Sequence, residues 1–194
     1  MVTAELIKNL RDKTGASINE CKKALEESGG DLGRAEKVIE KKLGSLAGKR
    51  VGRKTGAGIV DAYIHSDKRI GVLVELFSET DFVARNPEFV MLAHGLALHI
   101  AALGPQYLSR DSVPDEIVNA ERARFEEEVQ RLGKPEKIMR EIIDGKLASH
   151  FGAVSLLEQP YIKDQDKTVR EVINEAIGKF GENIQVGRFV RFEL

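Results

Sequence analysis

The spacing of apolar residues changes on the two sides of a glycine-rich segment at residues 46–58. Before this segment, apolar residues recur every three or four positions, which is typical of helices, and after it they tend to alternate, which is typical of strands. The segment also carries four basic residues and no acidic one. Because this composition favours a mobile connection, we expect a domain at 1–45, a flexible linker at 46–58 and a second domain at 59–194.

Three short helices are predicted in the first domain from the spacing of its apolar residues. Ser17, followed three residues later by Glu20, forms a capping box at the start of the second helix. Asp31 caps the third helix, which we expect to end at Gly44. Cys21 lies on the apolar face of the second helix, so a packed thiol is a better interpretation than a reactive nucleophile.

The second domain is predicted to be α+β, with an antiparallel sheet packed against helices. Segments 59–65 and 70–77 are rich in β-branched residues and flank the polar tetrad 66–69, which indicates a hairpin. The segment 154–162 also reads as a strand, and the chain closes with the alternating strand NIQVGRFVRFEL.

Helices are expected between these strands. Asn86 caps one that starts at Pro87 and ends at Gly104. The others are expected from 114 to 132, from 136 to 149 and from 168 to 180.

Composition indicates which classes of function are absent. The formal net charge is −1, so the chain has no overall attraction to nucleic acid. Its apolar runs are too short for a membrane helix, and its first residues lack the pattern of a secretory signal. We therefore expect a cytoplasmic protein that contacts neither membranes nor nucleic acid directly.

No catalytic or metal-binding arrangement is visible. His94 and His99 are five residues apart, so they point to different faces of a helix, unlike the pair in a zinc helix. We expect both to be partly exposed. Arg53 stands before Lys54 where a phosphate-binding loop needs glycine. Since no nucleophile and base are paired either, we expect no enzyme and no cofactor.

The segment TDFVARN at 80–86 fits two interpretations. It lies between an apolar strand and a well-capped helix, and it places an acid beside a large aromatic residue. In one interpretation Phe82 fills the core under its own turn. In the other the segment is a binding loop held by two rigid elements.

This segment resembles the signature of bacterial translation elongation factor Ts, the guanine-nucleotide exchange factor of elongation factor Tu. LRDKTGASINECKKAL at 10–25 is similar to the second signature of that family. VSLLEQPYIKD and the closing GENIQVGRFVRFEL are similar too, so the resemblance covers essentially the whole chain. It implies a ubiquitin-associated-like three-helix domain, a linker and an α+β core.

The resemblance also implies a function. The chain would bind elongation factor Tu in its GDP form, displace magnesium and promote GDP release, without covalent chemistry. Thr80, Asp81, Phe82 and Val83 match the residues that enter the GTPase domain, where Phe82 would act as a wedge.

Further partner contacts are implied residue by residue. Four residues of the first domain match positions that contact a helix of the GTPase domain: Arg11, Ile18, Asn19 and Lys22. Four more match other contact positions: Arg50, His65 and the pair Ile162 and Lys163, which would reach another domain. The alternatives are ordinary solvated surface for Arg11 and Lys22, and a core position for Ile162.

Two departures from the family bear on assembly and binding. Ser17-Ile18-Asn19 stands where many members have Gly-Met-Met. The chain resembles short members with a single copy of the core sheet unit, for which a homodimer is expected. Val190 stands where some of these have cysteine, so this dimer would be non-covalent there. On the closing strand we expect an apolar face to cover: Ile184, Val186, Val190 and Phe192.

Two other classes of function stay open at this point. A ribosome-associated or nucleic-acid module could use the basic segment 46–58, although that segment lacks interleaved aromatic residues. A ubiquitin-type interaction module could use the three helices alone, but it would leave the 80–86 segment without a role.

Overall fold

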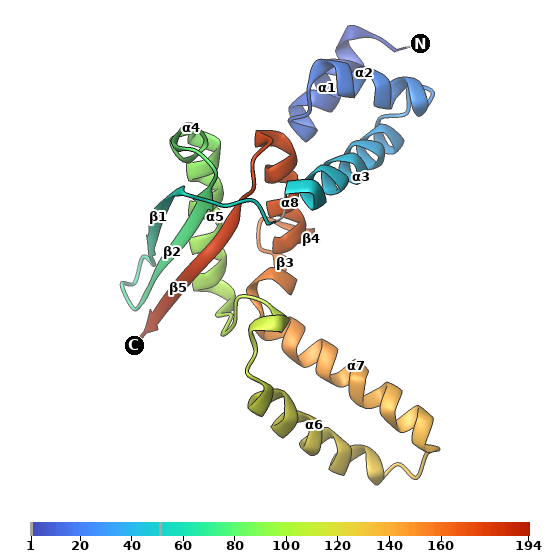
Figure 1. The fold of residues 1–194 in the computed structure, drawn as a ribbon, viewed down its shortest axis with the longest axis vertical. Helices are drawn as coiled ribbons and strands as arrows, with labels where there is room; N and C mark the ends of the chain where they lie inside the picture. The colour runs from blue at the N-terminus through green and yellow to red at the C-terminus, as the bar shows by residue number, and fades with distance from the viewer. Residues whose placement is uncertain (1, 51) are drawn as a thin grey trace. The chain divides into compact units, whose positions relative to one another are not determined.

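The computed structural model describes residues 2–50 and 52–194, shown as a ribbon in Figure 1. The helices are α1 (Ala4–Thr14), α2 (Ile18–Glu27), α3 (Leu32–Arg50), α4 (Asp81–Ala84), α5 (Pro87–Leu103), α6 (Asp115–Gln130), α7 (Glu136–Val154) and α8 (Val169–Phe180). Two short 3-10 helices are η1 (Arg110–Ser112) and η2 (Leu156–Glu158). The strands are β1 (Ala57–Ile64), β2 (Ile70–Ser78), β3 (Pro160–Tyr161), β4 (Asp164–Thr168) and β5 (Gln185–Glu193). The predicted α+β class is confirmed.

Contacts within the chain define two compact units. The first unit comprises Met1–Val60, Glu75–Ala93 and Glu171–Gly187. The second unit comprises Asp61–Val74, His94–Arg170 and Arg188–Leu194. The division into 1–45, 46–58 and 59–194 stays a prediction, and residue 51 of the expected linker lies outside the described residues.

The N-terminal helices form because they share one buried cluster. α1 begins after Thr3, whose hydroxyl accepts a hydrogen bond from the Leu6 amide (3.2 Å), and ends at Gly15 in the left-handed region (φ 66°). The cluster contains residues from all three helices: Leu10, Ala16, Cys21, Ala24, Leu25, Ala35, Ile39 and Leu43. Isolated helices of this length are marginal in water, so this burial stabilises them.

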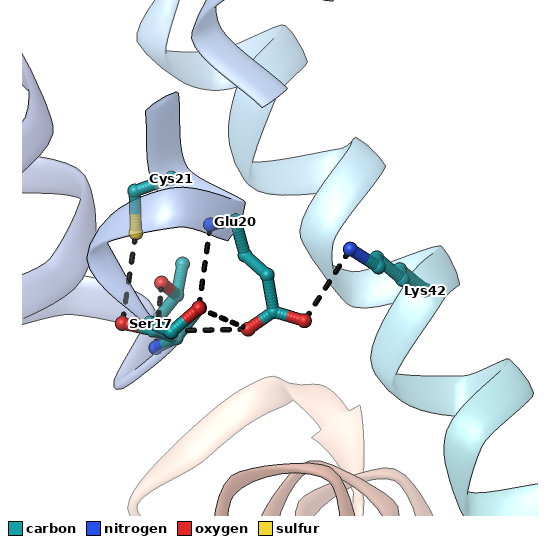
Figure 2. A network of polar contacts seen from close by, with 6 residues as sticks. Ser17, Glu20, Cys21 and Lys42 are labelled. Atoms are coloured by element: carbon teal, nitrogen blue, oxygen red, sulfur yellow. Dashed lines mark hydrogen bonds and ion pairs between the residues drawn. The ribbon is translucent and has the colours of Figure 1, made fainter. Parts of the chain in front are cut away.

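The start of α2 confirms the predicted capping box (Figure 2). The amide and hydroxyl of Ser17 donate to Glu20 Oε2 (3.2 and 2.8 Å), and the Glu20 amide donates to Ser17 Oγ (3.3 Å). Glu20 Oε1 lies 3.3 Å from Lys42 Nζ, which ties α2 to α3. The Cys21 thiol is fully buried and donates to the Ala16 carbonyl (3.7 Å). Burial raises the pKa of Cys21, so the expected packed thiol is confirmed.

The predicted end of the third helix at Gly44 is wrong, because α3 continues to Arg50. An interior glycine costs only about 1 kcal/mol relative to alanine, which does not by itself end a helix. Lys49 and Arg50 lie in the last turn, where positive charge interacts favourably with the helix dipole. The first part of the expected linker is therefore helical.

The main sheet has the strand order β1-β2-β5 and is antiparallel (Figure 1). The His65 amide donates to the Ile70 carbonyl (2.9 Å) and closes the predicted β1–β2 hairpin, in which Lys68 adopts a positive φ of 61°. On β2 the buried side chains alternate, at Val72, Val74 and Leu76. The expected hairpin and closing strand are confirmed.

The predicted strand at 154–162 is wrong for most of its length. α7 extends to Val154, η2 follows, and only Pro160 and Tyr161 form a strand, which pairs with β4. An apolar run such as VSLL fits a buried helix end as well as a strand, and periodicity alone does not separate them. β4 (Asp164–Thr168) is polar and has no apolar alternation, so no strand was predicted there.

α6 and α7 form a helical pair in the second unit. Their shared buried cluster contains Val113, Phe125, Val129, Ile143, Leu147 and Phe151. Two ion pairs join the helices, Arg122 with Asp144 (3.0 Å) and Lys146 with Glu128 (2.6 Å). Across residues 2–50 and 52–194, none of the helices combines the length and apolar character that a membrane span requires.

Replacing Ser17 by alanine should destabilise α2 by about 1 kcal/mol, the usual cost of losing a capping hydroxyl. Amide hydrogen exchange within α2 measures the change. Ser149→Ala, at an exposed position of α7, is the matched control and should leave α2 unaffected. Equal protection of α2 in both variants would contradict the capping role.

The capping box should also be visible in the titration of Glu20. The hydrogen bond from the Ser17 side chain is the main reason that the pKa of Glu20 lies below its ordinary value of 4.5. Because the folded-state pKa is depressed, this contribution to stability is present above the ordinary value and is lost as the pH falls through the folded-state value. An NMR titration of the Glu20 carboxyl should give a midpoint below 4.5, and Ser17→Ala should raise it. A midpoint insensitive to Ser17→Ala would argue against this assignment.

Candidate functional site

The predicted site residues Thr80–Val83 form a tight turn at the end of β2. Thr80 is the residue before α4, with extended backbone angles (φ −129°, ψ 158°), and Asp81 begins the helix. The Phe82 side chain is 91% exposed, so the interpretation in which it fills the core is wrong. Asp81 is exposed too, and its carboxylate lies 3.6 Å from the Arg85 guanidinium. The turn therefore presents an acid and an aromatic ring side by side to solvent.

Glu182, which lies 102 residues further along the chain, holds this turn in place. The Thr80 amide donates to Glu182 Oε2 (3.0 Å), and the Thr80 hydroxyl donates to Glu182 Oε1 (2.6 Å). Both oxygens of one carboxylate thus bind one residue, which fixes its backbone and its side chain together. Ser78 Oγ donates to the Thr80 carbonyl (3.0 Å) from the other side.

A second set of contacts joins the same two segments, but here the later segment donates the hydrogen bond and the earlier segment accepts it. The Asn183 amide donates to Glu79 Oε1 (2.7 Å), and the Asn183 side chain donates to the Arg53 carbonyl (2.8 Å). The Arg53 guanidinium lies 3.5 Å from Glu79. The hydrogen bond from the Asn183 amide is the main reason that the pKa of Glu79 is lowered. Glu79 therefore stays ionised at neutral pH and keeps accepting these bonds.

The far side of the turn is anchored by the start of α5. Asn86 Oδ1 accepts a hydrogen bond from the Glu88 amide (2.9 Å), as expected for a cap before Pro87. The Asn86 amide donates to the Val83 carbonyl (2.9 Å), and Ala84 is buried. Contacts thus flank the turn on both sides, and the side chains of Asp81 and Phe82 are exposed between them.

The predicted contact residues of the N-terminal helices are all exposed. Ile18, Asn19 and Lys22 lie in α2 at a spacing that places them on neighbouring positions of one helix face. They are exposed, as is Arg11 in the last turn of α1. Lys22 Nζ lies 3.9 Å from Glu26 Oε1 one turn away, and both side chains are exposed.

The other predicted contact residues are distributed between the two units. Arg50 is half-buried at the end of α3 in the first unit. His65 lies after β1 in the second unit, exposed, with Nδ1 3.1 Å from the Tyr63 hydroxyl. Ile162 and Lys163 form the connection between β3 and β4, also in the second unit. Ile162 is half-buried and Lys163 is exposed, so a full core position for Ile162 is excluded.

The two helix histidines differ from expectation. His94 is exposed and lies 2.9 Å from Asp61 Oδ2, whereas His99 is fully buried, so the prediction of partial exposure is wrong for His99. α5 is buried on more of its faces than we expected from the two histidines in its sequence. Among residues 2–50 and 52–194, no three His, Cys, Asp or Glu side chains are grouped so as to hold a metal ion.

A family model described as "Elongation factor TS" matches residues 2–194 of the chain. The chain belongs to the elongation factor Ts family. Elongation factor Ts of Acetivibrio thermocellus is 49% identical over 193 residues, covering 100% of this chain and 90% of that protein. The elongation factor Ts proteins of Thermosipho melanesiensis and Coprothermobacter proteolyticus are 47% and 46% identical, again covering 100% of this chain and 99% and 98% of theirs.

The sequence of this elongation factor Ts family member singled out Asp81 and Phe82 but not the residues that bind their turn. Glu79, Glu182 and Asn183 received no role, although the last two belong to the closing GENIQV motif. The signal was present only as a polar Gly-Glu-Asn break before an apolar strand. Nothing local in the sequence connects that break to a turn 102 residues earlier.

A double-mutant cycle tests the contact between Thr80 and Glu182. Thr80→Val removes one donor, and Glu182→Ala removes both acceptors. Because the two side chains bind each other directly, their effects on the free energy of unfolding should be non-additive, with a coupling of about 1 kcal/mol. Urea unfolding of the single and double variants gives this value. Additivity within about 0.3 kcal/mol would contradict the contact.

Proposed function

We propose that this protein is a guanine-nucleotide exchange factor that acts on elongation factor Tu during translation elongation in the cytoplasm. It would bind elongation factor Tu in its GDP form, displace magnesium and promote GDP release. The observation that carries the proposal is the exposed Phe82 ring beside Asp81, on a turn fixed by Glu182. Membership of the elongation factor Ts family supports the same function.

Phe82 has the properties of a wedge. A fully exposed phenylalanine gains roughly 1.5–3 kcal/mol when an apolar pocket covers it, which is an available source of binding energy. Its ring has two rotatable side-chain bonds and stands on a turn whose backbone is already fixed, so little conformational entropy is lost on insertion. The Phe82 ring therefore can separate side chains of the GTPase domain at small cost to itself.

Asp81 supplies negative charge beside the wedge. Both side chains of its ion pair with Arg85 are exposed, and such pairs contribute little to stability. A partner can therefore break this ion pair at little cost. Magnesium neutralises the phosphates of a bound guanine nucleotide, and losing the ion weakens nucleotide binding. The Asp81 carboxylate, next to Phe82 in the chain, would come close to that site and disturb the charge balance that retains the ion.

No covalent step is needed for this activity. An exchange factor must bind the nucleotide-free partner more tightly than the nucleotide-bound partner, and linkage requires the nucleotide to weaken factor binding by the same ratio. The surface formed by Arg11, Ile18, Asn19 and Lys22 would supply binding that does not depend on the nucleotide. Arg50 and His65 would add contacts to the same partner, and Ile162 and Lys163 would reach another of its domains.

We also propose that the protein is a non-covalent homodimer through the outer face of its sheet. Four apolar side chains from three strands of the second unit are exposed: Ile64, Leu73, Val190 and Phe192. Phe192 is 68% exposed and Ile64 is 64% exposed. Ile184 and Val186, expected on this face, are buried within the chain itself, so the surface to cover lies further along β5. A second copy would present the same surface, as isologous dimers require.

Phe82→Ala should slow GDP release from elongation factor Tu by at least about tenfold, equivalent to roughly 1.4 kcal/mol, with little change in the melting midpoint. The near-constant stability follows from the exposure of Phe82. Phe89→Ala is the matched control because Phe89 is fully buried on the adjacent helix. That variant should lose roughly 3–5 kcal/mol of stability. Normal GDP release by folded Phe82→Ala protein would refute the wedge.

Phe192→Glu should convert the dimer to a monomer, because the substitution places a charge on the proposed apolar interface. Light scattering at micromolar concentration measures the mass. Ile138→Glu, which changes an exposed apolar residue of α7, is the control and should leave the mass unchanged. A wild-type chain that stays monomeric at high concentration would rule out the dimer.

A further inference from the structure

His99 is buried in the second unit and binds both flanks of the β3–β4 connection. Its Nε2 lies 2.9 Å from Gln159 Oε1, just before β3. Its Nδ1 accepts a hydrogen bond from the Ile162 amide (3.1 Å), just after β3. The side chain is 0% exposed, so water does not compete for either bond. One ring thus connects α5 to two points of a hairpin about 60 residues further along the chain.

These two bonds define the chemical state of the ring. An amide N–H is only a donor, so Nδ1 must be an unprotonated acceptor and Nε2 must carry the proton. The proton on Nε2 then points to the Gln159 oxygen, whose amide nitrogen donates to the Ala153 carbonyl (2.7 Å). Burial lowers the pKa of His99, so the ring is neutral at pH 7. All polar atoms of this arrangement are paired.

The hairpin also packs against α5 one turn before His99. A Cβ at Gly95 would lie 2.1 Å from the Tyr161 hydroxyl and 3.2 Å from Lys163 Nζ, so only glycine allows this approach. The Tyr161 ring stacks on the His99 ring with centroids 5.8 Å apart and an interplanar angle of 25°. β3 is thus held by stacking and hydrogen bonds, although it is only two residues long.

We propose that His99 is a positioning residue that fixes the Ile162–Lys163 turn in the conformation that contacts elongation factor Tu. This inference rests on the proposed function, in which these two residues reach another domain of the partner. Between Tyr161 and Asp164, which pair across the hairpin, Ile162 and Lys163 are the two connecting residues. The hydrogen bond from the Ile162 amide to His99 Nδ1 (3.1 Å) holds the backbone of this turn directly.

Two substitutions separate the two bonds of His99. In His99→Gln the amide nitrogen reaches the Nε2 position and keeps a donor for Gln159, but no acceptor faces the Ile162 amide. In His99→Asn the side-chain oxygen reaches the Nδ1 position and keeps that acceptor. If the Ile162 bond positions the turn, His99→Gln should be defective and His99→Asn should resemble the wild type.

The first readout is amide hydrogen exchange at Ile162 in the free protein. His99→Gln should speed exchange at this amide by roughly tenfold or more, since a protecting bond is lost. His99→Asn should keep it protected. Protection that persists in His99→Gln would overturn the inference, whatever the partner does.

The second readout is GDP release from elongation factor Tu as a function of factor concentration. His99→Gln should raise the half-saturating concentration by roughly fivefold to tenfold, and leave the maximal rate unchanged, because the turn contributes to binding and the Thr80–Val83 turn is intact. His99→Asn should restore the wild-type value. An exposed Ile162 amide with unchanged half-saturation would overturn the role of this turn in partner binding. Failure of the wild-type chain to accelerate GDP release would instead overturn the proposed function.

A third measurement uses the wild-type protein, so it does not depend on how the variants fold. Ring ¹⁵N chemical shifts of His99 should show the neutral tautomer with its proton on Nε2. A proton on Nδ1 would leave two donors facing each other at Ile162 and would overturn the arrangement.

Discussion

The binding of Thr80 by Glu182 is the interaction on which the proposed mechanism depends. An exposed aromatic side chain on a flexible loop would lose much of its binding energy to the entropy of ordering that loop. Here the two Glu182 oxygens bind the amide and the hydroxyl of Thr80, and Glu79 accepts the Asn183 amide in return. The backbone of this turn is therefore already ordered when the chain has folded, before any partner binds. In the proposed complex, Phe82 would insert without a further change in its backbone.

The same physical principle applies to the proposed contact in the second unit. Ile162 and Lys163 connect two very short strands that would be poorly stable alone. His99, 63 residues away in sequence, accepts a hydrogen bond from the Ile162 amide, and Tyr161 packs on its ring. In both units, a short turn proposed to contact elongation factor Tu is bound by a side chain from a distant part of the chain. Preorganisation of this kind favours binding without enlarging the contact surface.

Local chemistry was sufficient to predict many elements of the fold. The Ser17 capping box and the Asn86 cap satisfy backbone donors within three residues, so they can be read directly from sequence. The predicted helix end at Gly44 was wrong because one interior glycine destabilises a helix only weakly. The basic residues in the last turn of α3 stabilise its continuation to Arg50. The predicted strand at 154–162 was wrong because a short apolar run fits a buried helix end as well as a buried strand. The partners of Glu182 could not be predicted, since they depend on which segments the fold brings together.

The exchange activity is tested most directly by the affinity of the chain for elongation factor Tu with and without GDP. We expect saturating GDP to weaken the complex by at least about tenfold, within the range of ordinary coupling free energies, and the chain to weaken GDP binding by the same factor. Calorimetric titration in both orders gives the two ratios. Equal affinity for the GDP-bound and nucleotide-free forms would contradict the proposed mechanism, because a factor with no preference between them cannot weaken GDP binding.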